Sequence, residues 1–428
     1  MKLSLLLAPA LVTAALLQTQ NTRADAVTDW NEHLEEAVFA TAQPVPAQGR
    51  SAAIVHLAIF EAVNGITRDF QPYCIDARAP HGARAEAAAV QAAYTSLSAL
   101  YPAHQQALDA HLADSLAQIP GSCGRSTSIA RGRAWGEQVA LHILALRNND
   151  GWTTPQPAFM GGFEPGQWRS VATGANADGT LPAVFPQNAI LTPFVMSDPS
   201  QFRPEPPYGA ELPGALLSPR YARDLDEVKA VGRIDSALRT AEQTDIALLW
   251  QAMGPIDENR AARSVIPRHA RLVDNARLFA LLNMVACDAL IIGWDSKFAY
   301  QLWRPHHAIR LADTDGNPAT VADPTWSALI LAPRFPEYVS NHSTLTAAIM
   351  RVLARELGDA HRFTLGSPLK PGFVQEFKKF SDAAAQAMEA RLWGGIHFRT
   401  ACEVGNQLGV ELADAAIESL LTPMNRRR

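Results

Sequence analysis

The sequence predicts an all-α fold, and three observations support this prediction. Apolar residues recur at spacings of three and four along most of the chain, which is the period of an amphipathic helix. The alternation of Val, Ile and Thr that marks strands is almost absent. The chain has 428 residues and four cysteines, so it can bury a large core without disulfides. We therefore expect helical bundles held together by apolar packing.

Two helical bundles are expected, because a proline-rich segment interrupts the helical pattern. Residues 151–220 contain twelve of the 29 prolines, so this segment should be a mostly irregular connection. The expected parts are a signal peptide (1–26), an N-terminal bundle (27–150), the connecting segment (151–220) and a C-terminal catalytic bundle (221–428). The helices are expected at about 51–65, 83–100, 104–118, 128–148, 220–232, 240–253, 273–303, 342–357, 373–391 and 398–420.

The N-terminus has the features of a cleavable secretory signal. Lys2 is followed by an apolar run over residues 3–17 and then by an A-x-A pattern at residues 24–26. Pro9 and the short length of the run argue against a permanent membrane anchor. We therefore expect an exported protein, periplasmic or secreted, that has no membrane association after cleavage.

Export would place the four cysteines in an oxidising space, where disulfides can form. Cys74 and Cys123 lie in loop-like stretches and could pair, whereas Cys287 and Cys402 lie in apolar helical segments and should be buried as small apolar residues.

The overall charge indicates no charged macromolecular partner. The formal net charge is −5, so no basic field draws the chain to nucleic acid. Any site for an anion must therefore be local.

Apolar faces within residues 51–148 could pack against a second copy of the chain, in a homo-oligomer.

Three segments of the C-terminal half concentrate cations and histidines. In SKFAYQLWRPHHAIR, Lys297 and Arg304 are seven apart, so we expect both on one face of a helix that Pro305 ends. Two such cations are costly to bury without an anion, so this segment alone favours an ordinary pair of surface residues. Either His306 or His307 could line the site, but a solvent-facing pair at the helix end is the favoured interpretation.

The second and third segments add an oxyanion site and two more candidate groups. In FPEYVSNHSTL, Ser340 or Ser343 should cap a helix whose first backbone N–H groups can bind an anion, with His342 in the first turn. In EARLWGGIHFR, Arg391 and His397 flank two glycines, and His397 should begin the next helix. Together the positive charges of the three segments could balance the negative charge of a tetrahedral oxyanion, phosphate or vanadate.

The combined pattern resembles a known family. K-x6-R-P, P-x3-S-x-H-S and R-x5-H, in this order, resemble the vanadium-dependent haloperoxidases and the acid phosphatases of the same superfamily, which includes type 2 phosphatidic acid phosphatases. The stretch NARLFALLNMVACDALIIGWDSKF is similar to the lysine-bearing helix of the chloroperoxidase branch. VTDWNEH, VHLAIFEAVNGI and LALRNNDGW are similar to secreted bacterial members.

The resemblance implies a vanadate cofactor and assigns a role to each residue. His397 would bond to vanadium, and His342 would be the acid–base residue near the apical oxygen. The oxygens would be held by Lys297, Arg304, Arg391, Ser340 and the backbone N–H of Asn341. Trp294 and Phe335 fall where the chloroperoxidase branch has aromatic residues beside the halide.

Two positions depart from the family. Asn341 stands where the family usually has Gly, which keeps the backbone N–H but adds a side chain beside the anion. The fungal members have a carboxylate that orients one arginine, and it would align near Met253, with Asp257 as the nearest replacement.

Three functions are compatible with these motifs. The first is a haloperoxidase that oxidises halide with hydrogen peroxide to hypohalous acid, with a small organic molecule as a further substrate. The second is an acid phosphatase with a phosphohistidine intermediate, and the third is a non-catalytic oxyanion-binding protein. Chain length, Trp294 and Phe335, and similarity along most of the chain favour the haloperoxidase.

Overall fold

The computed structural model describes residues 25–120, 125–171, 179–267, 269–367 and 369–424, and it confirms the all-α prediction. Its helices are α1 (Ala26–Ala40), α2 (Val45–Thr67), α3 (Ala85–Leu100), α4 (Gln105–Gln118), α5 (Arg125–Leu146), α6 (Pro219–Val231), α7 (Ala241–Ala252), α8 (Pro255–Val265), α9 (Leu272–Tyr300), α10 (Pro305–Arg310), α11 (Asn341–Leu357), α12 (Phe380–Trp393) and α13 (Arg399–Ser419). One antiparallel hairpin joins β1 (Phe363–Gly366) to β2 (Val374–Phe377).

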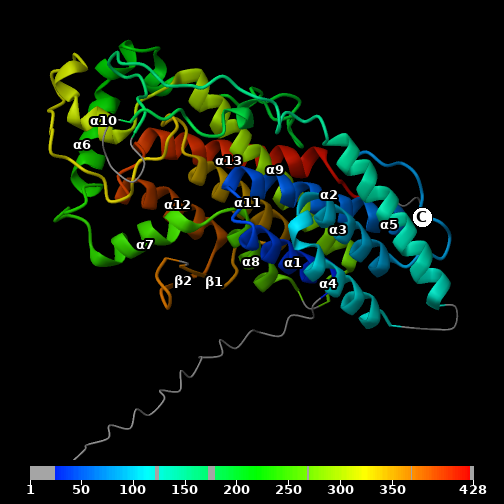
Figure 1. Cartoon of the computed structure of the whole chain (residues 1–428). Coiled ribbons are helices and arrows are strands. Elements are labelled where there is room, and N and C mark those ends of the chain that lie inside the picture. Colours follow the sequence, from blue (N-terminus) through cyan, green and yellow to red (C-terminus); the bar gives the residue numbers. More distant parts are fainter. Residues whose placement is uncertain (1–24, 121–124, 172–178, 268, 368, 425–428) are drawn as a thin grey trace, which may run out of the picture.

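Helix α9 lies at the centre of the molecule. It packs against α2 on one side and against α11 on the other (Figure 1). Among the described helices it is the one long and apolar enough to cross a membrane, but its most apolar stretch is wholly buried inside the fold. It therefore has the burial expected of the core helix of a globular protein.

The other helices form two groups around α9. In Figure 1, α2, α3 and α5 lie toward one end, and α6, α7, α10 and α12 lie toward the other. In the first group α3 packs against α2 and α5, and in the second α11 packs against α12 and α13. One cluster of buried apolar residues extends from α1 to α13, so the two groups share a continuous core.

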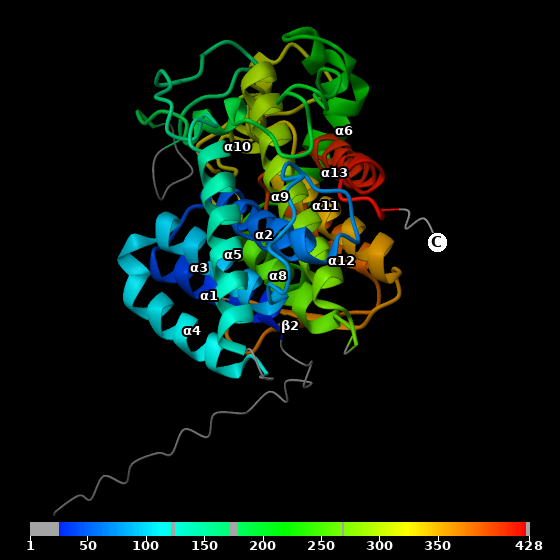
Figure 2. The same cartoon turned by 90° about the vertical axis from the view of Figure 1, so that its right-hand side faces the viewer.

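The described residues of the connecting segment are mostly irregular, as predicted, and they are tied to α9. The buried carboxylate of Asp288 accepts hydrogen bonds of 2.7–3.1 Å from the backbone N–H groups of residues 194–196. Further on, the N–H of Trp168 donates to the carbonyl of Gln301, and that of Trp303 donates to Gly166. In Figures 1 and 2 the segment runs along the upper surface, on the side away from α4 and α8.

Several local features differ from the sequence prediction. The helix expected at 373–391 begins only at Phe380, because residues 374–377 pair with β1. Helix α2 begins at Val45 rather than near residue 51, with Pro44 as its N-cap. Helices α1, α8 and α10 were not predicted; α10 has six residues, too few for a periodic pattern to emerge.

The predicted signal peptide falls almost entirely on residues 1–24, which lie outside the described residues, as does Cys123, the partner proposed for Cys74. Helix α1 begins with a capping box in which the Asp25 carboxylate accepts from the N–H of Thr28 and the Thr28 hydroxyl accepts from the N–H of Asp25. Cys287 and Cys402 are buried, as expected.

A buried carboxyl group between α8 and α11 makes a stability prediction possible. Glu258 is almost fully buried, and its Oε1 accepts a 2.7 Å bond from the hydroxyl of Thr346. Burial raises the pKa of Glu258 to about 8. In the unfolded chain the pKa of this group is near 4.5. The neutral acid therefore contributes stability that is fully present below pH 4.5 and is lost as the pH rises through about 8.

Glu258→Gln should therefore unfold less readily than the wild type at high pH. Between pH 5 and pH 9, the unfolding free energy of the variant is expected to rise by roughly 2–5 kcal/mol relative to that of the wild type. Denaturant unfolding at both pH values measures it, and Glu137→Gln, at an exposed position of α5, is the control. Equal pH dependence in both variants would contradict the assignment.

Candidate active site

Three buried cations converge between α9, α11 and α12. Lys297, Arg304 and Arg391 are among the most deeply buried large side chains of the described chain. Burial lowers the pKa of Lys297 well below its usual value and lowers the pKa of both arginines to about 10. We call these three residues, with Ser340 and His397, the cage.

Backbone carbonyl groups hold the cations in place but leave part of each arginine without a partner. Lys297 Nζ donates to the carbonyls of Glu337 (2.9 Å) and Val339. Arg304 Nε donates to Phe335 and Nη1 donates to Ile396, at 2.9 and 2.8 Å. Within the described residues, Arg304 Nη2 and Arg391 Nε have no hydrogen-bond partner. Such buried donors favour an anionic ligand.

Lys297 and Arg304 do not share a helix face, so that prediction was wrong. Helix α9 ends at Tyr300, because Gln301 takes a left-handed conformation with φ 51°. Arg304 is instead the N-cap of α10, and Pro305 begins that helix rather than ending α9. The two cations reach the cage from separate elements.

Glu337 is a site residue that the sequence analysis missed. Its side chain is fully buried, and its Oε1 accepts 2.8 Å and 2.9 Å bonds from His397 Nδ1 and the N–H of Phe398. Burial raises the pKa of Glu337 to about 7, although the charges of Arg304 and Lys297 oppose this rise. Its position in the second motif, three residues before Ser340, was the available signal.

Two contacts fix the tautomer of His397. Burial and the neighbouring cations, Arg304 first, hold the pKa of His397 well below its usual value, so the ring is neutral. With Glu337 accepting at Nδ1, the proton belongs on Nδ1. Arg304 Nη1, which can only donate, lies 3.1 Å from His397 Nε2. His397 therefore presents the Nε2 lone pair to the cage. It precedes α13 by two residues rather than beginning it.

The N-terminus of α11 contributes the groups that the second motif predicted. Ser340 is the N-cap, and its Oγ accepts from the N–H of Ser343 at 3.4 Å. Asn341 and His342 follow in the first turn, where backbone N–H groups favour an anion. Burial, and next the charge of Arg391, lower the pKa of His342 well below its usual value, so that its ring is neutral near pH 7.

The side chain of Asn341 fits only because α9 has a glycine opposite it. A Cβ atom added to Gly293 would lie 1.8 Å from Asn341 Oδ1. Gly293 is four residues before Lys297, so it lies on the face of α9 that carries this cation. Both polar atoms of the Asn341 amide are buried and have no hydrogen-bond partner in the described part of the chain. This amide is thus a further unsatisfied group beside the cage.

Glycines also allow the segments of the cage to approach closely. On α13, a Cβ at Gly405 would lie 2.9 Å from the carbonyl of Ser340, and one at Gly409 would lie 2.2 Å from that of Thr344. Gly395, with φ +74°, turns the chain after α12 against Gly232 at the end of α6. The predicted close turn between Arg391 and His397 is confirmed.

The two aromatic residues predicted beside the halide are brought together. The ring centroids of Trp294 and Phe335 lie 5.1 Å apart. The Phe335 ring also faces the cations, with Arg304 Cζ 4.8 Å and Lys297 Nζ 5.5 Å from its centroid. Phe335 is partly exposed, whereas Trp294 is buried and donates to the carbonyl of Val184 at 3.4 Å.

Two further expectations are corrected. His306 and His307 are buried in α10 rather than exposed to solvent, because α10 packs against α6. Asp257 does not orient an arginine of the cage; its carboxylate accepts from the N–H of Gly254 at the start of α8 and lies 3.5 Å from Arg260.

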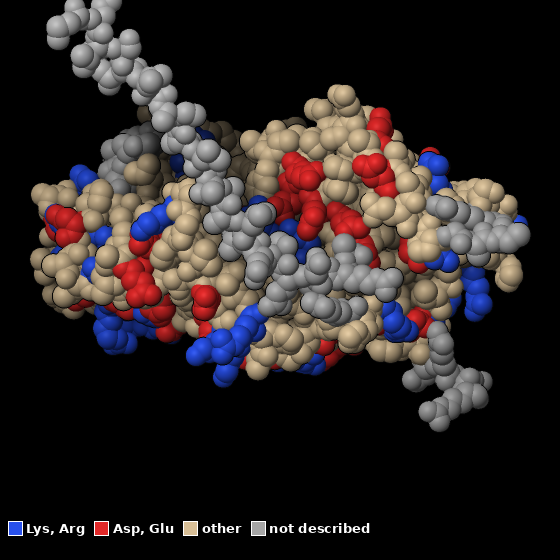
Figure 3. All heavy atoms as spheres, turned by 90° about the horizontal axis from the view of Figure 1, so that it is seen from below, with Lys and Arg blue, Asp and Glu red and all other residues tan. Residues whose placement is uncertain are grey.

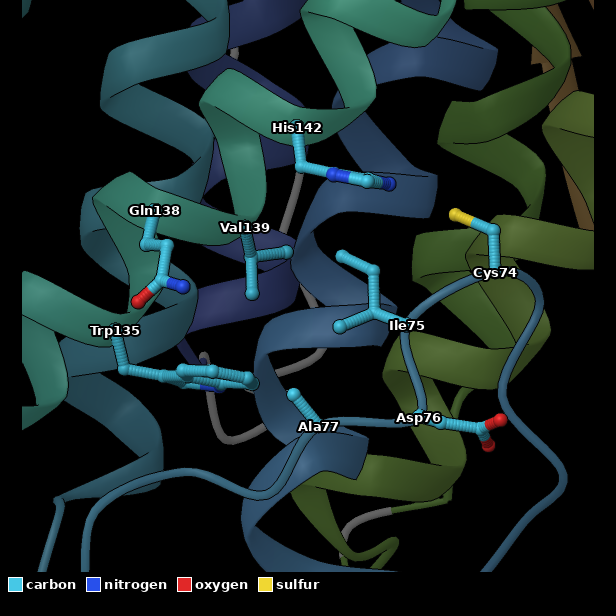
Figure 4. Close-up of a pocket in the computed structure, with 8 residues that line it drawn as sticks. All are labelled: Cys74, Ile75, Asp76, Ala77, Trp135, Gln138, Val139 and His142. Atoms are coloured by element: carbon cyan, nitrogen blue, oxygen red, sulfur yellow. The ribbon is translucent and has the colours of Figure 1, made fainter.

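A separate pocket of about 360 Å³ lies between α5 and the segment that follows α2. Figure 4 shows His142 extending from α5 toward the sulfur of Cys74. Burial, and next the charge of Glu61, raise the pKa of the Cys74 thiol to about 12, so it is a poor nucleophile near neutral pH. The lining contains no residue of the cage. We therefore place the candidate active site at the cage.

Comparisons with known proteins support the resemblance. Residues 277–426 match the family described as the VCPO second helical-bundle domain. Vanadium chloroperoxidase of Curvularia inaequalis is 24% identical over 382 residues, which are 72% of this chain but 61%, less than two thirds, of that protein.

Solved structures extend the similarity to most of the chain. A bacterial vanadium-dependent iodoperoxidase superposes with a TM-score of 0.74 at 25% identity, over 93% of this chain and 97% of that chain. An apo-type bacterial vanadium-dependent chloroperoxidase superposes with a TM-score of 0.69 at 18% identity, over 87% and 92%. The resemblance to the vanadium haloperoxidases is therefore confirmed in sequence and in fold.

The fit between Gly293 and Asn341 can be tested with two substitutions. Gly293→Ala should lower the unfolding free energy by about 1–3 kcal/mol through overpacking, even though Ala stabilises helices by about 1 kcal/mol relative to Gly. Adding Asn341→Gly should restore most of this loss. Chemical denaturation of both variants and of Asn341→Gly alone completes the cycle. Additive effects would show that the two positions do not interact.

Proposed function

We propose that this chain, which resembles the vanadium haloperoxidases in sequence and in fold, is a vanadate-dependent haloperoxidase. The observation that carries the proposal is the neutral His397, whose Nε2 lone pair faces a buried group of three cations. A lone pair donor surrounded by fixed positive charge is suited to an oxyanion whose central atom accepts a nitrogen ligand.

The residues of the cage fit vanadate in charge and in hydrogen bonding. Lys297, Arg304 and Arg391 supply three positive charges, and Glu337 is the carboxylate whose charge acts on both Lys297 and Arg304. The unpartnered Arg304 Nη2 and Arg391 Nε can donate to its oxygens, as can the N–H groups that begin α11. His397 Nε2 would be the ligand of vanadium.

Each residue then has a physical task in the reaction. Glu337 holds the proton on Nδ1 of His397 and so keeps Nε2 as a ligand. The cations stabilise negative charge on the oxygens without reorganising, because backbone carbonyls fix them in advance. Neutral His342 can accept a proton from hydrogen peroxide as it binds. Bound vanadate supplies the Lewis acidity that activates peroxide toward halide.

The aromatic pair is proposed to line the path of the halide. Phe335 is the partly exposed member and stacks on Arg304, so it lies at the edge of the cage. An apolar ring beside fixed cations admits a weakly hydrated anion while it limits water. Trp294 supports this ring from α9.

An acid phosphatase is the second candidate, because the same groups suit phosphoryl transfer. His397 Nε2 would form a bond to phosphorus as the bond to the leaving alcohol breaks, and His342 would give that alcohol a proton. The aromatic pair beside the cations and the similarity in fold to a vanadium-dependent iodoperoxidase over most of the chain favour the haloperoxidase.

A paired assay separates these functions. After incubation with orthovanadate, the purified chain should halogenate a phenolic dye when given hydrogen peroxide and bromide or iodide. The preparation without vanadate should be assayed with an aryl phosphate. Phosphate release without halogenation would support the phosphatase, and neither activity with intact vanadate binding would support an oxyanion-binding protein.

His397→Ala is the decisive variant in this assay. It removes the proposed ligand, so halogenation should fall by at least about 10³-fold, to the level of free vanadate. His81→Ala, at an exposed position, is the matched control and should keep full activity. Halogenation retained by His397→Ala would overturn the assignment of the ligand.

Glu337→Ala tests the positioning of His397, because alanine has no oxygen that can accept from Nδ1. Vanadate needs the Nε2 lone pair, whereas inorganic phosphate can be held by the cations alone. The variant should therefore lower the ratio of vanadate affinity to phosphate affinity by about 10–100-fold. Calorimetric titration with both anions measures the ratio, and Glu403→Ala on the surface of α13 is the control. An unchanged ratio would show that Glu337 has no positioning role.

A further inference from the structure

Two surface helices of the N-terminal group each carry a histidine and a carboxylate at the same spacing. His33 and Glu36 are three residues apart on α1, and His111 and Asp114 are three residues apart on α4. Residues three apart lie on one face of a helix, so each helix presents an imidazole and a carboxylate together. Helices α1 and α4 pack against each other. The two pairs therefore meet at one interhelical contact.

The ring nitrogens of both histidines converge on one carboxylate oxygen. His111 Nε2 lies 2.8 Å and His33 Nδ1 lies 3.5 Å from Glu36 Oε2. The two rings are stacked, with centroids 3.6 Å apart and planes inclined by 16°. The three ligand atoms lie within 4.8 Å of one another. Small side-chain rotations would bring them to the separation of about 3.3 Å that a tetrahedral ion with bonds of 2.0–2.1 Å requires.

The surroundings of the cluster suit a cation. Figure 3 shows the underside of the molecule, where acidic side chains gather near the middle. Exposed acids of the two helices are Glu32, Glu36, Asp109 and Asp114.

We propose that His33, Glu36 and His111 form a binding site for a divalent transition-metal ion such as Zn²⁺. Two imidazoles and a carboxylate belong to the ligand set of zinc and of its first-row neighbours, whereas calcium and magnesium prefer oxygen ligands alone. The ion would join α1 to α4 and so stabilise the N-terminal group. The site shares no residue with the cage.

Zinc titration of the chelator-treated full chain tests this site. Calorimetry should show one zinc ion bound per chain, and zinc should raise the melting temperature, because the ion binds the folded state. His111→Ala should weaken zinc binding at least about tenfold and abolish most of the thermal shift. His142→Ala, an exposed histidine of α5, is the matched control and should behave as the wild type.

Trp30 offers a second readout at the site itself. Its ring meets His33 edge to face, with centroids 5.2 Å apart, and its Nε1 donates to Ser115 on α4. Cu²⁺ should quench part of the tryptophan fluorescence of the wild type and of His142→Ala but not of His111→Ala. Glu36→Gln, at an exposed position, should reproduce the loss of zinc binding. Zinc binding that is equal in wild type and His111→Ala, or absent from both, would overturn the proposal.

Discussion

The burial of three positive charges in one place is the constraint on which the rest of this structure depends. Lys297, Arg304 and Arg391 are removed from water, and each would lose several kcal/mol of hydration free energy without compensation. The fold offsets part of this cost with backbone carbonyl oxygens, and Glu337 supplies a negative charge. Positive charge still exceeds negative charge among these groups. An oxyanion would complete the balance, which is why we propose that the cage is a binding site rather than a structural ion-pair network.

The architecture can be understood as the means of holding these charges at close range. Helix α9 is the buried central helix, so Lys297 near its end has a fixed position. Helices α11 and α13 approach closely enough at Gly405 and Gly409 that the N-terminus of α11 points into the cage. The connecting segment covers the end of α9 and bonds to the backbone on either side of Leu302, which positions Arg304. Small residues and backbone bonds, rather than ion pairs, therefore set the geometry of the site.

The fold class and most of the site could be predicted from the sequence, because periodicity and motif spacing are local properties. The end of α9 could not be predicted, because Gln301 leaves the helical conformation there. The backbone of residues 301 and 303 is hydrogen-bonded to residues 168 and 166, which are far away in the sequence. Glu337 was missed for a related reason: an acid within an apolar run is informative only when the cations around it are known. The complementarity of Gly293 and Asn341 likewise joins two positions 48 residues apart that no pattern connects. The burial of His306 and His307 depends on packing against α6, which is also a tertiary property.

We propose that one histidine nitrogen and three buried cations hold one oxyanion. A crystal structure of the chain soaked with orthovanadate is the decisive test, because the anomalous signal of vanadium identifies the position of the metal. We expect a single strong vanadium peak at bonding distance from His397 Nε2, with oxygens in hydrogen-bond contact with Lys297, Arg304 and Arg391. Vanadium bound elsewhere, or an empty cage at millimolar orthovanadate with His397 Nε2 still bonded to Arg304, would contradict it.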